Sequence, residues 1–171
     1  MKKILLIAFL FISAIAFAQT SPVIPMDKSP MDMVYYPASY PVLKIQDKIT
    51  EPLTARIIYS RPQKSGRPIF GDLIPYGQVW RLGANEATEI EFFRPVRIGA
   101  VKVKKGRYTL YCIPNQDKWT LILNKDTDTW GAFKSDQSKD LLPIDLPLQK
   151  QSQIFVWFEM FFEKTTTGAT M

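Results

Sequence analysis

The residues best suited to chemistry lie in one irregular stretch, residues 67–88, which is rich in glycine, proline, aromatic residues and arginine. Long irregular segments that keep aromatics and arginine are often ordered and functional. Arg81 offers a planar fork for a carboxylate, sulfate or phosphate, and Asn85 tolerates a left-handed backbone and could orient such a group. Tyr76 and Trp80 could stack on a sugar or an aromatic ligand. This pattern predicts a ligand-binding site on the stretch.

Further charged residues belong to the same candidate site. Arg61 and Arg67 flank the turn at Gly66 and could join Arg81 in one basic pocket. Glu86 could act as a general acid or base beside Arg81, which would stabilise charge. An alternative interpretation stays open. An arginine and a glutamate in one loop often pair with each other, surface arginines are usually solvated, and a tryptophan often fills a core.

The composition excludes several other chemistries. The chain has no histidine and one cysteine, Cys112, which excludes Ser-His-Asp and Cys-His catalysis, histidine metal sites and an internal disulfide. It has no glycine-rich phosphate loop and no EF-hand spacing, and we predict no metal and no cofactor. Glu89 and Glu91 could form a hydrolytic pair, but their alternation with Ile90 and Phe92 is typical of a solvent-facing side of a strand.

Residues 1–18 have the pattern of a secretory signal peptide. Two lysines precede a largely apolar run over residues 4–16, and Ala16-Phe17-Ala18 has the small-x-small pattern of a cleavage site. The apolar run is too short for a membrane span. We therefore expect an exported, periplasmic or secreted protein with no membrane span after cleavage and no nucleic-acid partner. Its partner is expected to be a small molecule or an envelope component.

The rest of the chain is predicted to be a proline-rich N-terminal arm, residues 19–52, and a single β domain, residues 53–171. The arm is expected to lie extended on the domain with a short edge strand at residues 42–45, and a loose linker is the alternative. Period-two and β-branched segments predict strands at residues 53–60, 88–93, 96–98, 101–103, 107–113, 119–123 and 154–163.

Short strands without a sustained helical period favour an all-β fold, either an antiparallel β-sandwich or a jelly-roll-like barrel. Residues 130–133 are expected to pack inward, and residues 154–163 to form a long, largely buried strand. Residues 164–168 are typical of a hairpin connection, and residues 169–171 of the start of a strand. The domain is therefore expected to lack its last strand, which would leave the strand at 154–163 with an exposed edge.

A set of motifs runs through the chain: Tyr59-Ser60-Arg61-Pro62, Gly66-Arg67-x-Ile69-Phe70-Gly71, Leu73-x-Pro75-Tyr76-Gly77-x-Val79-Trp80-Arg81-x-Gly83-Ala84-Asn85-Glu86-Ala87-Thr88, Gly106-x-Tyr108-x-Leu110 and Ile113-Pro114. Together they resemble a family of exported bacterial proteins, the domain of unknown function 2911 family. The resemblance covers residues 30–171 and implies a secreted or periplasmic β-rich domain. It implies no activity. Members usually continue past the final hairpin into another strand.

Three functional hypotheses follow, and whether the protein is an enzyme stays open among them. The first is binding of a small anionic or sugar-like ligand, or of an envelope partner, through residues 67–88 together with Arg61. The second is an envelope hydrolase or lyase in which Glu86 is the catalytic acid or base and Arg81 stabilises charge. The third is a purely structural module in which the irregular stretch plugs the core.

Overall fold

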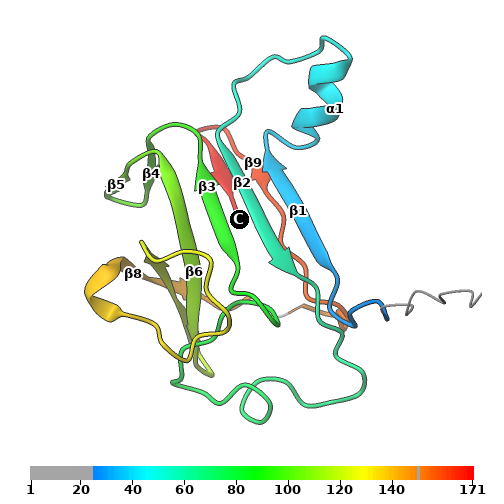
Figure 1. The fold of residues 1–171 in the computed structure, drawn as a ribbon, viewed down its shortest axis with the longest axis vertical. Coiled ribbons are helices and arrows are strands. Elements are labelled where there is room, and N and C mark those ends of the chain that lie inside the picture. The colour runs from blue at the N-terminus through cyan, green and yellow to red at the C-terminus, as the bar shows by residue number, and fades with distance from the viewer. Residues whose placement is uncertain (1–24, 150) are drawn as a thin grey trace, which may run out of the picture.

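The computed structural model describes residues 25–149 and 151–171, and the signal peptide expected at residues 1–18 lies outside them. The described chain is built on one six-stranded antiparallel sheet with the order β1-β2-β3-β6-β7-β8 (Figure 1). The expected all-β antiparallel fold is confirmed, and the sheet does not close into a barrel because β1 and β8 are its edges. Its strands are β1 (Met31–Tyr36), β2 (Ala55–Ser60), β3 (Glu89–Phe92), β6 (Gly106–Pro114), β7 (Lys118–Asn124) and β8 (Asp140–Pro147).

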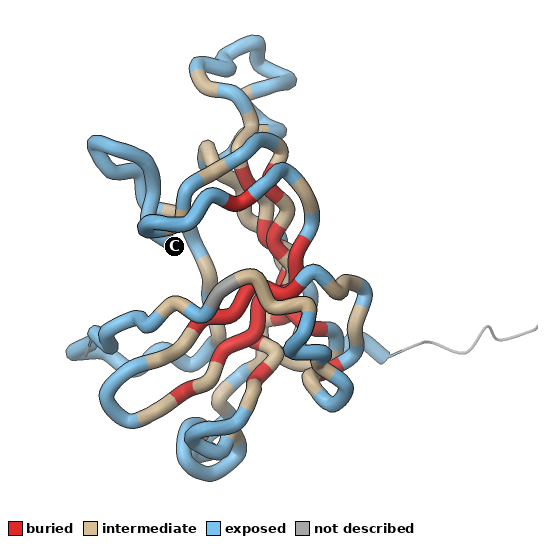
Figure 2. Tube along the Cα trace, turned by 90° about the vertical axis from the view of Figure 1, so that its left-hand side faces the viewer, coloured by how far each residue is buried: buried red, intermediate tan, exposed pale blue. Residues whose placement is uncertain are grey.

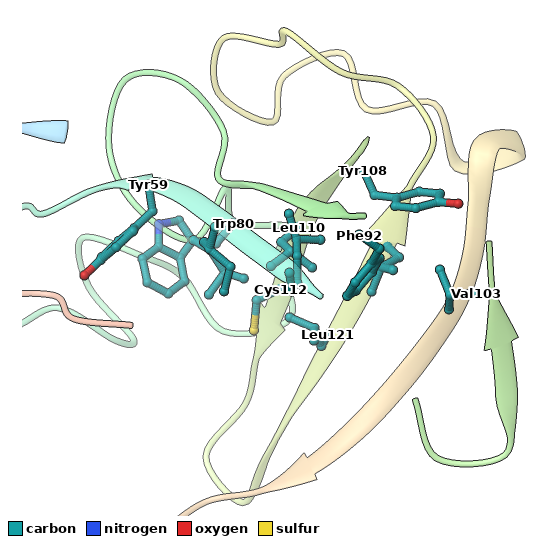
Figure 3. Packing of buried hydrophobic residues seen from close by; sticks show 13 residues of the cluster. Tyr59, Trp80, Phe92, Val103, Tyr108, Leu110, Cys112 and Leu121 are labelled. Carbon is teal, nitrogen blue, oxygen red and sulfur yellow. The ribbon is translucent and has the colours of Figure 1, made fainter. Parts of the chain in front are cut away.

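One face of the sheet carries the main core, because alternate residues of each strand point to the same side. Buried residues concentrate in the central strands (Figure 2). Cross-strand neighbours such as Ile57 and Ile90, or Leu110 and Leu123, lie side by side on this face. Trp80 joins them from the irregular stretch (Figure 3). At about 25 cal/mol per Å² of apolar area, burying such side chains is the main force that holds the sheet to its cover.

The cover over this face consists of two short hairpins and two irregular segments. The hairpins pair β4 (Val96–Ile98) with β5 (Val101–Val103), and β9 (Glu163–Lys164) with β10 (Ala169–Thr170). The expected hairpin at residues 164–168 is therefore present. The irregular segments are residues 67–83 and 154–162, from which Ile74, Phe158, Met160 and Phe162 pack against the core.

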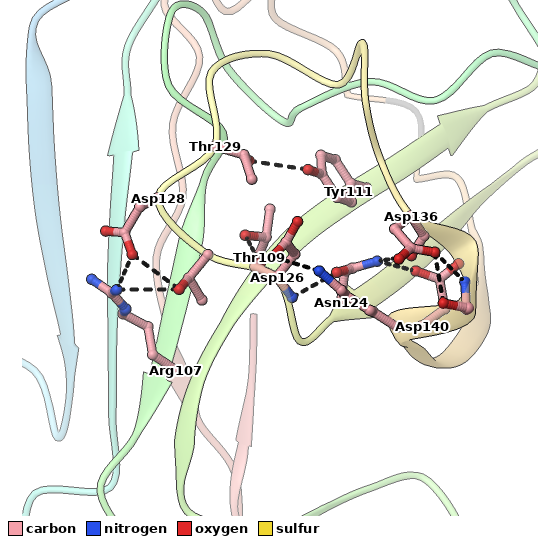
Figure 4. Close-up of polar contacts among 12 residues, drawn as sticks. Arg107, Thr109, Tyr111, Asn124, Asp126, Asp128, Thr129, Asp136 and Asp140 are labelled. Carbon is pink, nitrogen blue, oxygen red and sulfur yellow. Dashed lines mark hydrogen bonds and ion pairs between the residues drawn. The ribbon is translucent and has the colours of Figure 1, made fainter.

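On the opposite face, a smaller cluster forms around Tyr111, Ile122 and Ala87. The connection between β7 and β8 lies over this face and is tied down by hydrogen bonds (Figure 4). The Thr109 hydroxyl donates to the Asp126 carbonyl at 2.6 Å. The Asn124 amide donates to a carboxylate oxygen of Asp140 at 2.6 Å and to the Asp136 carbonyl at 2.9 Å. Asn124 and Thr109 are buried, so these bonds satisfy polar groups that would otherwise be costly.

Arginines from neighbouring strands neutralise the glutamate pair of β3. Arg56 Nη2 lies 2.5 Å from Glu91 Oε2, and Arg107 Nε lies 3.4 Å from Glu89 Oε2. Arg56, Glu91 and Arg107 are register neighbours across β2, β3 and β6. Both glutamates lie on the side opposite the main core. We conclude that they form a charged ladder on the sheet surface and not a hydrolytic pair.

The N-terminal arm differs from the expected conformation. Its strand is β1, which pairs with β2 along six residues, from Met31 opposite Ser60 to Tyr36 opposite Ala55. The edge strand expected at residues 42–45 is wrong. These residues belong to a short helix, α1 (Tyr40–Ile45), which has Pro41 in its first turn. Proline is well suited to that position because its missing N–H is not needed there.

Two aromatic segments are more exposed than the sequence indicates. Residues 154–162 are not a regular strand, and Phe155 and Phe161 are 52% and 58% exposed. Only the even-numbered side chains Phe158, Met160 and Phe162 face and pack against the core, because side chains of an extended segment alternate between two sides. The expectation that residues 130–133 pack inward is wrong for their aromatic members, because Trp130 and Phe133 are 63% and 82% exposed.

The strand β8 was not predicted from the sequence. Its two prolines, Pro143 and Pro147, obscure the strand pattern. Proline is tolerated on an edge strand because one row of N–H groups faces away from the sheet. β8 pairs only with β7 and can therefore accept both prolines. Within the described residues, no helix has the length and apolar character needed to cross a membrane.

Cys112 is expected to resist thiol reagents in the native protein. Its side chain is 1% exposed, and burial raises the pKa of the thiol to about 12. The reactive thiolate is therefore scarce near neutral pH. We expect negligible reaction with Ellman's reagent at pH 8 over a period in which the urea-unfolded protein reacts completely. Rapid reaction of the folded protein would contradict the buried position.

Candidate functional site

A groove of about 1020 Å³ lies between the irregular stretch and the C-terminal segment 154–161. Its aromatic wall is a set of rings in edge-to-face or tilted contact. The Trp80 ring centroid lies 5.3 Å from that of Phe158 and 5.9 Å from that of Trp119. Phe70 covers both tryptophans, at 5.6 Å from Trp80 and 4.8 Å from Trp119. The wall therefore joins three segments that are distant in sequence.

Around this wall, the groove exposes further apolar side chains. Leu73 is 53% exposed, Tyr76 39%, Ile154 78% and Phe161 58%. Adjacent apolar groups that line a hollow and remain in contact with water are typical of a binding surface, whereas single exposed apolar residues are common on any protein.

Arg81 is held at this groove by its backbone. The preceding residue, Trp80, exchanges two main-chain hydrogen bonds with Cys112 of β6, at 2.7 and 2.8 Å. The Arg81 carbonyl accepts from the Thr88 N–H at 3.0 Å. Residues 78–82 therefore make a single bridge to the sheet, at Trp80, and do not form a strand of their own.

The Arg81 side chain lacks a counter-ion within residues 25–149 and 151–171. Its Nε atom is buried and has no hydrogen-bond partner there. Burial lowers the pKa of the guanidinium below its ordinary value. The residue lines the large groove and also a second opening of about 340 Å³, so it lies between the two hollows. A cation desolvated in this way is positioned to bind an anion.

Two more cations line the groove without a carboxylate partner in the described part of the chain. Arg67 donates from Nε to the Lys64 carbonyl at 3.1 Å and from Nη2 to the Gln63 carbonyl at 2.7 Å. The Lys64 ammonium makes no ion pair in that same part of the chain. The one carboxylate among the lining residues is Glu159, which is bound to Arg61. The groove is therefore positively charged.

Arg61 does not join Arg67 and Arg81 in a basic pocket. Its Nη1 atom lies 3.1 Å from Asp32 Oδ2, and Nη2 pairs with Glu159. Its Nε atom also donates to the Phe158 carbonyl at 3.4 Å. Arg61 thus links the end of β2 to β1 and to the C-terminal segment. Both terminal nitrogens of its guanidinium already bind carboxylates, one on Asp32 and one on Glu159.

Asn85 and Glu86 also lie outside the lining of the groove. Asn85 has a φ of 59°, the left-handed conformation expected for it, and its carbonyl accepts from the Gly131 N–H at 3.0 Å. Glu86 is exposed and forms a β-bridge with Trp130. The structure therefore divides the predicted site: Arg67, Tyr76, Trp80 and Arg81 meet at the groove, whereas Arg61, Asn85 and Glu86 do not line it.

Comparison with known families gives one match. Residues 41–171 of the chain match the family model described as protein of unknown function, DUF2911. The chain belongs to the DUF2911 family. This confirms the resemblance seen in the sequence motifs. Neither a curated protein nor a solved structure matches the chain. The DUF2911 match supplies no activity.

The DUF2911 motif at residues 81–88 is held in place by a set of hydrogen bonds. The Ser60 hydroxyl lies 2.6 Å from both the N–H and the carbonyl of Ala84. The Thr88 hydroxyl donates to the Leu82 carbonyl at 2.5 Å. The indole N–H of Trp80 donates to the Gly83 carbonyl at 3.0 Å. These bonds fix the conformation of the loop that follows Arg81, so this part of the motif stabilises the fold.

Sequence reasoning missed the part of the groove that lies outside the motif. Lys64, Phe70, Trp119 and Phe158 all line it, and so do exposed residues of segment 154–161. One signal was available. The C-terminal run has aromatic or apolar residues on both alternating sides, which is more than a strand with one buried face requires. The same run predicts a long, largely buried strand at residues 154–163, and the structure forms no regular strand over 154–162.

Proposed function

We propose that the protein binds an amphipathic anion in this groove: a carboxylate, sulfate or phosphate joined to an apolar, aromatic or sugar-ring body. The observation that carries the proposal is Arg81, a partly buried cation without a counter-ion among the described residues, next to exposed aromatic rings. Arg67 and Lys64 add positive charge at the same groove.

The charge of Arg81 is partly desolvated and has no matching group among the described residues. Removing a guanidinium from water is unfavourable unless hydrogen bonds and an opposite charge replace the lost solvation. A bound anion supplies both, and charge-assisted hydrogen bonds are stronger than neutral ones. The apolar body of the ligand would remove water from the exposed rings. The groove volume of about 1020 Å³ is adequate for a ligand of this kind.

The place of action follows from the N-terminal sequence pattern and is part of the proposal. A protein with the signal peptide expected at residues 1–18 would meet its ligand after export. An envelope component or an exported metabolite with an acidic group would fit. The hydrolase alternative has less support, because Glu86 does not line the groove and Glu159, which does, is bound to Arg61.

Arg81→Met tests the proposal. Decanoate and decyl phosphate, below their micellar concentrations, are suitable probes, with decanol as the neutral comparison. Binding can be measured by calorimetry and by tryptophan fluorescence, since Trp80, Trp119 and Trp157 all line the groove. We expect the wild-type protein to bind both anions, and Arg81→Met to raise the Kd at least about tenfold, because a hydrogen bond to a charged group contributes about 1.5–3 kcal/mol.

The matched control is Arg94→Met, which removes the same charge from an exposed residue outside the groove. It should leave both Kd values within about twofold, as expected for a distant surface charge screened by salt. The proposal is wrong if the two variants weaken anion binding equally, or if decanol binds as tightly as decanoate.

A further inference from the structure

The side chain of Arg81 lies on the side of its segment that faces away from the main core. Trp80 and Leu82 both belong to that core, whereas Val79 packs against the smaller cluster on the other face of the sheet. Side chains of an extended segment alternate between two sides, so Arg81 shares the side of Val79. Ala132 packs against the same smaller cluster and lines the second opening together with Val79 and Arg81. The charge of Arg81 is therefore directed to that opening.

The second opening, of about 340 Å³, offers one positive charge and two neutral hydrogen-bond donors. Arg81 is the one charged residue among the described residues that line it, and Gln78 and Ser135 contribute an amide and a hydroxyl. Within residues 25–149 and 151–171, neither the Gln78 amide nor the Ser135 hydroxyl makes a hydrogen bond to another protein group. Both groups are therefore available to a ligand.

Main-chain hydrogen bonds hold the wall that carries Ser135 against the family motif. The Gly131 N–H donates to the Asn85 carbonyl at 3.0 Å, and the Ala87 N–H donates to the Thr129 carbonyl at 3.0 Å. These bonds join the connection between β7 and β8 to the loop that follows Arg81. The second opening thus has two anchored walls, and no residue of the C-terminal segment 154–161 lines it.

We propose that the second opening binds the head group of the ligand, and that this head is a monoanionic sulfate ester or sulfonate. The inference rests on the proposed function and names the chemical class of its anion. A carboxylate has two acceptor oxygens, and an arginine fork can satisfy both of them. A sulfate ester or sulfonate presents a third terminal oxygen, for which Gln78 and Ser135 supply donors.

Charge favours such a head over a phosphate ester. A phosphate monoester carries a charge of about −1.5 to −2 at pH 7, because its second pKa is about 6. Arg81 alone could neutralise only part of that charge within the second opening. A charge that is removed from water without full compensation is costly. A sulfate ester or sulfonate carries a single charge, which one guanidinium matches.

The apolar body of the ligand can still reach the groove, because residues 78–81 line both openings. The head would lie against Arg81 in the second opening, and the body would cross residues 78–81 to the aromatic wall. Phe133, which is 82% exposed, lines the second opening and would contact the part of the body next to the head.

Amphiphiles that differ mainly in the head group test the inference by calorimetry, below their micellar concentrations. We expect the wild-type protein to bind decyl sulfate and decanesulfonate at least about tenfold more tightly than decanoate, in line with one additional hydrogen bond to a charged group. Decyl phosphate should bind more tightly at pH 5 than at pH 7.5, because it is a monoanion at the lower pH. Decyl sulfate should bind equally at both. The chain has no histidine, so the protein itself contributes little to this pH dependence.

A double variant, Gln78→Leu with Ser135→Ala, removes both neutral donors and leaves Arg81 in place. It should raise the Kd of decyl sulfate at least about tenfold and leave that of decanoate within about twofold. The matched control is Gln116→Leu with Ser152→Ala, at two exposed residues that line neither opening, and it should leave both Kd values unchanged. In NMR spectra of the wild type, the side-chain amide resonances of Gln78 should shift with decyl sulfate but not with decanol.

The outcomes separate the two proposals. The inference is wrong if decanoate binds as tightly as decyl sulfate, if decyl phosphate binds more tightly at pH 7.5 than at pH 5, or if the double variant weakens both anions equally. In each of these cases, decanoate binding that depends on Arg81 would still support the proposed function. If Arg81→Met binds every anion as the wild type does, the proposed function itself fails, and the inference fails with it.

Discussion

Trp80→Ala is expected to lower the free energy of unfolding by about 3–5 kcal/mol, the range for truncation of a large buried aromatic residue. Trp80 is 7% exposed and packs against the rings of Phe70, Trp119 and Phe158. The substitution would leave a cavity where the irregular stretch, β7 and the C-terminal segment meet. It would also leave the Gly83 carbonyl without its indole donor, which adds to the cost.

The control for this prediction is Trp130→Ala. Trp130 is 63% exposed, so the same truncation should change stability by no more than about 0.5 kcal/mol. Urea unfolding followed by far-ultraviolet circular dichroism is suitable for both variants, since the signal does not depend on the removed indole. Equal losses in the two variants would show that Trp80 is not a core residue. The anion-binding assay on Trp130→Ala should match the wild type, because Trp130 does not line the groove.

Gly83→Ala is expected to destabilise the protein by about 1–3 kcal/mol, as overpacking of a tight site does. An added Cβ would lie 2.7 Å from the Ser60 hydroxyl oxygen and 3.3 Å from the Ser60 carbonyl oxygen. The hydroxyl has little freedom to move, because it lies 2.6 Å from both the N–H and the carbonyl of Ala84. Either the loop shifts or these hydrogen bonds break.

Two comparisons make the Gly83 experiment specific. Gly168→Ala adds the same methyl group where nothing lies within 4 Å, and it should change the unfolding free energy by no more than about 0.5 kcal/mol. In a Ser60→Ala background, Gly83→Ala should cost less than in the wild type, because the clashing oxygen is gone. Additive losses would contradict the proposed contact, since residues in contact show a coupling energy.

Together, these variants divide the family motif by role. Trp80 and Gly83 should affect stability, whereas Arg81→Met should affect anion binding with little loss of stability, because a buried unpaired charge does not stabilise a fold. If Arg81→Met instead destabilised the protein by several kcal/mol, the motif would be structural throughout. The third hypothesis from the sequence would then be favoured over ligand binding.

Local patterns determined much of the fold. Alternation across residues 88–93 and 107–113 predicted strands of the central sheet, because period-two burial is a local property of an extended chain. The same patterns failed at β8 and at α1. For β8 the decisive fact is its position at the edge of the sheet, and for α1 it is the absence of a strand to pair with. Neither can be inferred from a short window of sequence.

The irregular stretch at residues 67–88 was likewise predicted from its composition to carry a candidate site, and Arg67, Tyr76, Trp80 and Arg81 line one groove. Tertiary structure alone decided which arginines remain available. Arg61 is neutralised by Asp32 and Glu159, which lie 29 and 98 residues away in sequence, whereas Arg81 meets no carboxylate in the described chain.

Tertiary structure also decided which residues of the C-terminal segment line the groove. The aromatic residues on this side of the groove come from the segment at 154–161, which the sequence predicted to be buried. The physical reason is the same for the arginines and for these aromatic residues. Residue types and their spacing determine which side of a strand is apolar and which loops need special geometry. Which charges are compensated and which aromatic rings stay exposed depend on contacts between distant segments, and these exist only once the sheet has formed.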